Sequence, residues 1–198
     1  MATFGYSTEP MENVMPVPAN WLEELVIEWL DLEGFVTSTN ISVPAKPGGK
    51  FAPDAVGAKR GEKGNLVIRH CEAAMFLIDA PDTVAERYAR KFSETESEVR
   101  SHFENVFGVG QSDRDVYEKW VITFQASENV QKALREVEPG VKIYFLKDFI
   151  RNEVLETIRK WKSRQPHPKT AGLPTDKCLL DVINRFEHFG LLTKEMTE

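Results

Sequence analysis

Acidic and potentially metal-ligating residues recur in the first half of the chain. Glu23 lies in a stretch whose apolar residues recur at helical spacing, and Asp54 follows Pro53. In the sequence HCE, His70 and Glu72 are two residues apart. In a strand, alternate side chains share a face, so His70 and Glu72 should point the same way. Carboxylates gathered at one place bind hard cations such as Mg²⁺. Such a cation activates water and stabilises negative charge at phosphorus, so the chemistry indicated is metal-assisted hydrolysis.

Each of these residues also has a structural interpretation. Glu23 can be a first-turn carboxylate favoured by the helix dipole, and Asp54 can be a turn residue. His70 can be a hydrogen-bonded histidine of the interior, and the His70/Glu72 pair can mark a strand end that reaches solvent. Cys71 faces away from His70 and is expected to be a small core residue. The metal-site interpretation requires the side chains of Asp54 and Glu72 to lie close together, with Glu23 nearby.

Hydrophobic periodicity predicts the elements that must position these residues. A helix is predicted from a cap at Asn20 to a stop at Gly34. Strands are predicted over residues 35–44, 51–59, 65–75, 117–127 and 141–149. Further helices are predicted over residues 79–108, 128–140, 150–164 and 175–192. The second and third strands should form a hairpin, and the two late strands a parallel crossover, giving a mixed sheet with helices on both faces.

Three segments organise the chain. Residues 1–19 are a loose polar lead-in, 20–165 form the α/β core, and 166–198 are a linker followed by a C-terminal helix. The length of 198 residues suits one ordinary domain with a small helical appendage.

Composition narrows the classes of function. With 41% hydrophobic and 28% charged residues the chain is globular, and its net charge of −6 argues against coating nucleic acid by bulk positive charge. The 2 cysteines lie outside any CxxC pattern, so zinc is not indicated and a reduced, cytoplasmic setting is expected. The first residues do not resemble a signal peptide, and no apolar run is long enough for a membrane span.

The order of these motifs resembles the PD-(D/E)xK nuclease superfamily. The stretch "PDAVGAK" is similar to the strand that carries the signature Pro-Asp, here Pro53 and Asp54. The stretch "VIRHCEA" is similar to the (D/E)xK strand, with His70 at the acidic position and Glu72 at the lysine position. The helix "LEELVIEWLDLEGF" corresponds to the one that precedes the core, in which Glu23 would join the metal site.

The resemblance implies a restriction-endonuclease-like three-layer α/β fold and a nuclease that hydrolyses DNA with Mg²⁺ or Mn²⁺. Asp54, Glu72 and Glu23 would hold the metal, with His70 as a further catalytic residue. The lysine of the pattern is absent from its usual place, so Glu72 would serve as base or ligand. Lys59 could supply the positive charge, although on alternation it faces away from Asp54.

The missing lysine also allows a second interpretation, in which the fold has lost its chemistry. The protein would then serve as a DNA-binding or protein-assembly module, and a homodimer is compatible with either interpretation. A small-molecule α/β enzyme has no motif in its favour.

Contact with DNA requires basic residues that face the phosphates. Basic residues cluster in "KRGEK", "ERYARKF" and "RKWKSRQPHPK". The candidates for nucleic-acid binding are Lys59, Arg60, Arg159, Lys160, Lys162 and Arg164. The alternative for the last four is a solvated helix end, because cations suit the C-terminus of a helix dipole.

Overall fold

The computed structural model describes residues 21–38, 41 and 52–192. The predicted lead-in and the cap at Asn20 lie outside these residues. The strands are β1 (Val36–Ser38), β2 (Ala55–Arg60), β3 (Leu66–Leu77), β4 (Val116–Ala126) and β5 (Lys142–Phe145). The helices are α1 (Trp21–Leu32), α2 (Pro81–Phe107), α3 (Glu128–Val137), α4 (Leu146–Phe149), the π-helix η1 (Ile150–Val154), α5 (Leu155–Ser163) and α6 (Cys178–His188).

The strands form one mixed sheet in the order β1-β2-β3-β4-β5. β1, β2 and β3 make an antiparallel meander, and β4 and β5 each add in parallel. The predicted hairpin between the second and third strands and the predicted parallel crossover through α3 are therefore confirmed. Long helical connections are what parallel neighbours require, since a tight turn cannot join them.

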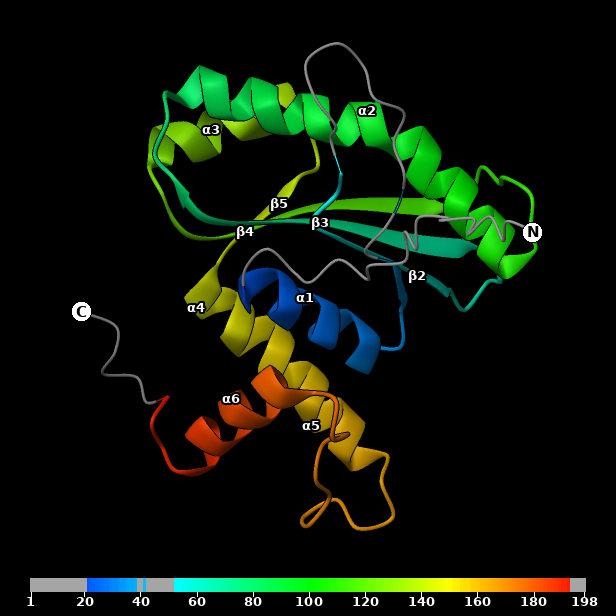
Figure 1. The fold of residues 1–198 in the computed structure, drawn as a ribbon, viewed down its shortest axis with the longest axis vertical. Helices are drawn as coiled ribbons and strands as arrows, with labels where there is room; N and C mark the ends of the chain where they lie inside the picture. The colour runs from blue at the N-terminus through cyan, green and yellow to red at the C-terminus, as the bar shows by residue number, and fades with distance from the viewer. Residues whose placement is uncertain (1–20, 39–40, 42–51, 193–198) are drawn as a thin grey trace, which may run out of the picture.

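Helices cover both faces of the sheet (Figure 1). α2 and α3 lie on one face, while α1 and the α4–α5 segment lie on the other, with α6 packed outside them. Strand alternation divides β3 between the two layers: Cys71 and Ala73 join the core cluster beneath α1, as predicted for Cys71. His70 and Glu72 consequently face α2. In the described part of the chain, no helix has both the length and the apolar composition needed to cross a membrane.

The structure corrects the predicted end of the last strand. Residues 146–149 were expected to continue the last strand, but β5 ends at Phe145 and α4 begins at Leu146. Leu146 and Phe149 are three residues apart and both buried, a spacing that belongs to a helix face. β1 covers Val36–Ser38 of the predicted 35–44 strand, and residues 39–40 and 42–44 lie outside the described part.

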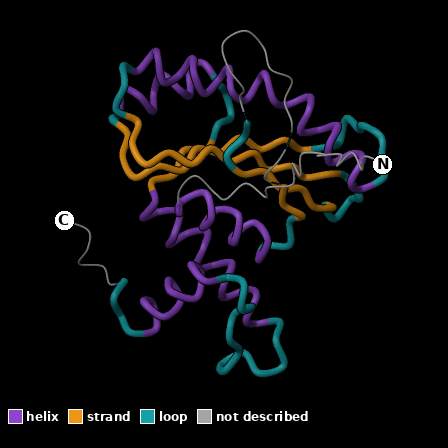
Figure 2. The backbone as a smooth tube through the Cα atoms, viewed as in Figure 1, coloured by secondary structure: helices purple, strands orange, loops and turns teal. Residues whose placement is uncertain are grey.

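The C-terminal helix is joined to the core by a carboxylate from α1. Glu28 is only 5% exposed, and its two oxygens accept hydrogen bonds from the backbone N–H groups of Leu179 (3.2 Å) and Leu180 (2.9 Å). α6 has no side-chain cap of its own, so Glu28 satisfies the first N–H groups of that helix from another element. Leu180 is fully buried in the same cluster as α1. Figure 2 shows the long loop that precedes this docked helix.

Glu28→Ala should therefore lower the free energy of unfolding. It leaves two N–H groups at the start of α6 without their charged acceptor, which corresponds to about 2–3 kcal/mol. Urea unfolding followed by circular dichroism measures the change. Glu24→Ala, an exposed position on the same helix, is the control. Equal stability of the two variants would contradict the docking role of Glu28.

Candidate active site

Asp54 and Glu72 are neighbours across the β2–β3 hairpin. The register pairs Ala55 with Cys71, so Asp54, one residue before, lies opposite Glu72, one residue after. The Oδ2 atom of Asp54 accepts a hydrogen bond from the backbone N–H of Ala73 at 2.9 Å, which fixes the carboxylate against β3. Glu72 is fully buried, so the strand does not end in solvent there. The proximity of Asp54 to Glu72 that the metal-site interpretation requires is therefore present, whereas Glu23 is on α1.

A lysine from α2 lies between the two carboxylates. Lys91 Nζ donates to Asp54 Oδ1 at 2.7 Å and to Glu72 Oε2 in a still closer contact. Its side chain is 17% exposed, so the charged trio sits at the edge of the core rather than on the open surface. Lys91 was not among the site residues predicted from the sequence, although it lies in the basic stretch "ERYARKF". A signal existed: Lys91 falls three residues after Tyr88 and four before Thr95, on the buried stripe of α2.

Burial makes the carboxylates weaker acids than usual. Burial raises the pKa of Glu72 to about 7 against the attraction of Lys91, which acts to lower it. Burial and the nearby charge of Glu72 raise the pKa of Asp54 to about 6, again opposed by Lys91. Burial, with the two carboxylates, also raises the pKa of Tyr88 to about 12, which keeps its hydroxyl protonated beside the site. The ammonium of Lys91 is thus what offsets the cost of two buried negative charges.

His70 supports Glu72 instead of standing free for a metal. Its Nε2 lies 2.7 Å from Glu72 Oε1, and its Nδ1 lies 2.9 Å from the hydroxyl of Tyr117. The ring is fully buried, with Phe92 edge-on at 4.7 Å between centroids. Burial, together with the charge of Lys91, lowers the pKa of His70 to about 3. The structure thus favours the interpretation of His70 as a hydrogen-bonded interior histidine.

Glu23 lies in the first turn of α1, the helix on the other face of the sheet from Lys91. Among the described residues, no three His, Cys, Asp or Glu side chains group closely enough to hold a metal ion. The structure therefore brings together two of the three predicted metal ligands, Asp54 and Glu72.

Two carboxylates still suit Mg²⁺. This ion keeps several waters and is bound by one or two carboxylates together with phosphates of the substrate. Asp54 and Glu72 each have one oxygen bound to the protein and one oxygen directed at the cation of Lys91. The donor set therefore fits a small divalent ion that would take the place of the Lys91 ammonium between Asp54 Oδ1 and Glu72 Oε2.

The β2 candidates for DNA contact are engaged within the protein. Lys59 pairs with Glu33 at 3.7 Å and lies 4.2 Å from the centre of the Phe35 ring. These contacts are on the α1 side, as alternation predicted, so Lys59 does not supply positive charge to Asp54. Arg60 donates to the backbone oxygen of Phe107 at 3.1 Å.

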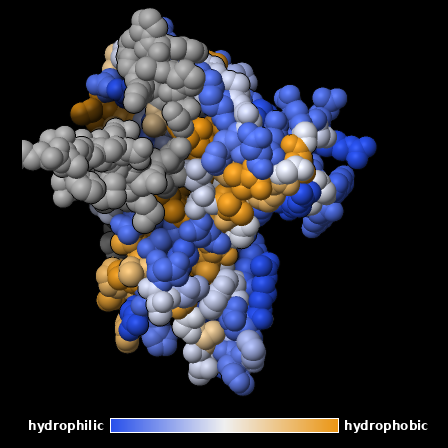
Figure 3. Space-filling model, turned by 45° about the vertical axis from the view of Figure 1, so that its right-hand side comes forward, coloured by the Kyte–Doolittle hydropathy of each residue, from blue (hydrophilic) through white to orange (hydrophobic). Residues whose placement is uncertain are grey.

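Three of the four α5 candidates have partners within the protein. The fourth, Arg164, is exposed at the end of the helix. Arg159 pairs with Glu187, Lys160 with Glu156 at 3.5 Å, and Lys162 donates to Asn184 at 2.7 Å. α5 lies beyond α1, on the far side of the sheet from α2 (Figure 1). These residues therefore do not form a surface continuous with the Lys91 site. On the face shown in Figure 3, hydrophilic residues surround smaller apolar areas.

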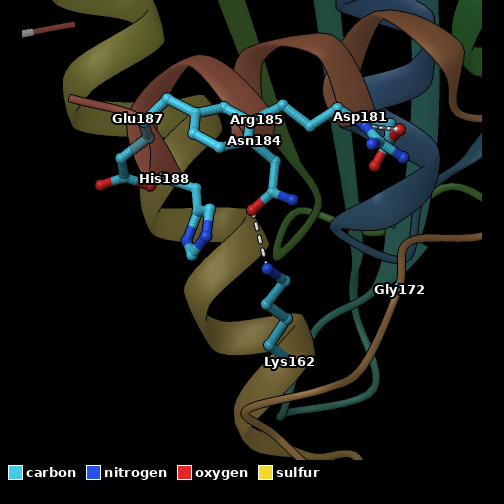
Figure 4. A pocket seen from close by; sticks show the side chains of 8 residues that line it. Lys162, Gly172, Asp181, Asn184, Arg185, Glu187 and His188 are labelled. Carbon is cyan, nitrogen blue, oxygen red and sulfur yellow. Dashed lines mark hydrogen bonds and ion pairs between the residues drawn. The ribbon is translucent and has the colours of Figure 1, made fainter. Parts of the chain in front are cut away.

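A pocket of about 470 Å³ lies between α5 and α6 (Figure 4). Lys162 points across it to Asn184, and Arg185 is paired with Asp181 at 2.7 Å. Glu187, which also lines the pocket, is paired with Arg159. Because these charged side chains are engaged within the protein, the pocket offers no concentrated charge to a ligand. The trio of Asp54, Glu72 and Lys91 remains the stronger candidate for chemistry.

Comparison with known proteins assigns no family to the chain. No protein-family model, no curated protein and no solved structure matches it. Function therefore has to be inferred from the geometry of Asp54, Glu72 and Lys91 and from the order of the strands.

Replacing Lys91 tests the electrostatics of the trio. Lys91→Met keeps the length of the side chain but removes the cation, which should cost about 2–4 kcal/mol of unfolding free energy at pH 8. Without Lys91 the carboxyl pKa values rise further above their ordinary 3.8 and 4.5. The folded variant then binds more protons than the unfolded chain, so its stability falls as pH rises. The deficit relative to wild type should be smaller at pH 5 than at pH 8.

Chemical unfolding at the two pH values measures this difference. Lys132→Met, which removes an exposed ion pair on α3, is the control and should behave alike at both. A Lys91→Met deficit that does not change with pH would show that Lys91 does not neutralise the two carboxylates.

Proposed function

We propose that this protein is a Mg²⁺- or Mn²⁺-dependent DNA nuclease of the PD-(D/E)xK type. Asp54 and Glu72 would hold the metal, and Lys91 would be the catalytic lysine. The observation that carries the proposal is the position of Lys91 Nζ, which contacts one oxygen of each carboxylate. A neighbouring Asp, Glu and Lys are the three side-chain types of the family's signature.

This geometry changes how the signature is placed on the sequence. The sequence analysis put His70 at the acidic position and Glu72 at the lysine position. With Lys91 beside Asp54 and Glu72, Glu72 takes the acidic role and the lysine comes from α2 instead of β3. The departure that cast doubt on catalysis is thereby compensated by a residue from another element.

The topology also supports the proposal. An initial helix, an antiparallel meander of three strands, a helix and a parallel strand follow one another. This order agrees with the restriction-endonuclease-like arrangement that the sequence resemblance implies. Asp54 and Glu72 lie on the two strands that carry the signature residues of that arrangement.

Each side chain has a role in the proposed reaction. When bound, the divalent ion would lower the pKa of a water and stabilise negative charge on the phosphodiester. Asp54 Oδ1 and Glu72 Oε2 are held in place to receive the ion. Lys91 would orient the attacking water or stabilise the developing charge on the phosphate, because its ammonium is at the site and 17% exposed.

The alternative is a nuclease fold without activity that serves as a DNA-binding or assembly module. One observation favours it: Lys91 already neutralises both carboxylates, so the site is electrostatically satisfied without a metal. Salt-dependent DNA binding without cleavage under any divalent metal would support this alternative.

Cleavage assays test the proposal directly. Purified protein is incubated with linear, supercoiled and single-stranded DNA in Mg²⁺, in Mn²⁺ or in EDTA. We expect metal-dependent cleavage that Asp54→Asn and Lys91→Met each reduce by at least about 100-fold, by analogy with the loss of an electrostatic catalytic group. Asp82→Asn, on the first turn of α2, is the control and should keep full activity. The proposal fails if no form of DNA is cut, or if Asp54→Asn matches wild type.

Metal affinity separates the role of Lys91 from those of the carboxylates. Lys91→Met removes a positive charge from the place where the metal would bind, so Mn²⁺ should bind about tenfold more tightly at pH 8 even though cleavage is lost. Asp54→Asn should weaken Mn²⁺ binding in the same calorimetric titration. Weaker binding by Lys91→Met would argue against a metal site between these carboxylates.

A further inference from the structure

We propose that His70 and Tyr117 form a positioning pair that leaves Glu72 with a single oxygen for the cation and thereby favours Mg²⁺ or Mn²⁺ over Ca²⁺. The consequence for the metal rests on the proposed function, whereas the arrangement of the imidazole does not. His70 is a positioning residue here because it acts through Glu72.

The arrangement consists of three side chains from two strands, Tyr117, His70 and Glu72. Tyr117 on β4 lies opposite Ile68, so its hydroxyl reaches diagonally to His70 on the neighbouring strand. The hydroxyl lies 2.9 Å from Nδ1, and Nε2 lies 2.7 Å from Glu72 Oε1. Both ring nitrogens are therefore engaged, and the imidazole connects the tyrosine to the carboxylate.

The chemistry of the partners sets the tautomer. At pH 8 Glu72 is the ionised partner of Lys91 and can only accept a hydrogen bond, so Nε2 of His70 carries the proton. Nδ1 is then the acceptor and the Tyr117 hydroxyl is the donor. Full burial of the ring opposes a second proton.

Packing prevents the imidazole from turning away. Phe92 lies edge-on to the His70 ring at 4.7 Å between centroids, and the Arg100 guanidinium lies 4.8 Å from the centre of the Tyr117 ring. Rotation of the imidazole would break both of its hydrogen bonds inside the core, where no water replaces them. The packing around His70 therefore also fixes the position of Glu72 Oε1, to which the ring is bonded.

The fixed oxygen limits how a cation can bind. Glu72 Oε1 is held by His70 and Asp54 Oδ2 by the N–H of Ala73. Oε2 and Oδ1 both face the ammonium of Lys91, which a metal ion bound to these two oxygens would displace. One oxygen from each carboxylate suits Mg²⁺, which takes six ligands at short distances and keeps waters. Ca²⁺ takes six to eight oxygens and often binds both oxygens of one carboxylate. Release of Oε1 should therefore reduce the preference for the smaller ion.

The experiment uses full-length His70→Leu, which removes the donor to Glu72, and His70→Gln, whose amide N–H can replace it. Tyr144→Phe is the matched control: it removes a tyrosine hydroxyl bonded to the carboxylate of Glu153 at 2.7 Å on a different strand. Titration calorimetry at pH 8 measures Mn²⁺ and Ca²⁺ affinity. Nitrogen-15 NMR of wild type without metal identifies the His70 tautomer, and urea unfolding checks that each variant folds.

We expect NMR to show one neutral His70 tautomer with the proton on Nε2. His70→Leu should lower the ratio of Mn²⁺ to Ca²⁺ affinity about tenfold. His70→Gln should restore most of that ratio, and Tyr144→Phe should leave it unchanged. A proton on Nδ1, or an unchanged ratio in folded His70→Leu, would overturn the inference.

The two proposals can fail separately. If the protein binds no divalent metal and cuts no DNA, the proposed function and the metal preference both fail, while the NMR result still decides the arrangement of His70. If wild type cuts DNA but its His70 carries the proton on Nδ1, the positioning pair is refuted and the nuclease remains.

Discussion

The ammonium of Lys91 between two carboxylates is the interaction on which the rest of the site depends. Burying Asp54 and Glu72 without a cation would leave two negative charges side by side in a low dielectric. Lys91 offsets this cost only because three conditions hold together. The β2–β3 register sets the carboxylates opposite each other, α2 lies across that pair, and His70 holds the far oxygen of Glu72.

Patterns among neighbouring residues were enough to predict much of the fold and part of the site. Alternation put His70 and Glu72 on one face, put Cys71 on the other and turned Lys59 away from Asp54, all as the structure has them. The hairpin between β2 and β3 was also predicted from the sequence, and this hairpin is enough to place Asp54 beside Glu72. Both depend on a two-residue period and a short turn, which neighbouring residues encode.

The missing part depends on how separate elements dock. Lys91 is 37 residues from Asp54 in the sequence. It reaches Asp54 only because α2 packs on the sheet in a position that places Lys91 over Asp54 and Glu72. Its place on the buried stripe of α2 was visible, but the partner of a buried lysine is set by packing. The end of β5 was predicted wrongly for a related reason. The apolar composition of Leu146 and Phe149 suits a strand, but their spacing of three residues suits a helix. In the structure they form a helix whose apolar side is buried in the same core cluster as α1.

The same separation along the chain bears on how the site is assembled. The β2–β3 hairpin needs only short-range contacts, whereas the contacts of Lys91 with Asp54 and of Tyr117 with His70 join residues 37 and 47 positions apart in the chain. Without α2 in place, Asp54 and Glu72 would face each other across the hairpin with no cation between them. Docking of α2 brings Lys91 between the two carboxylates, and Tyr117 on β4 completes the network around His70. The site is therefore complete only when both α2 and β4 have docked, and until β4 pairs with β3 that edge of the sheet is open to other chains.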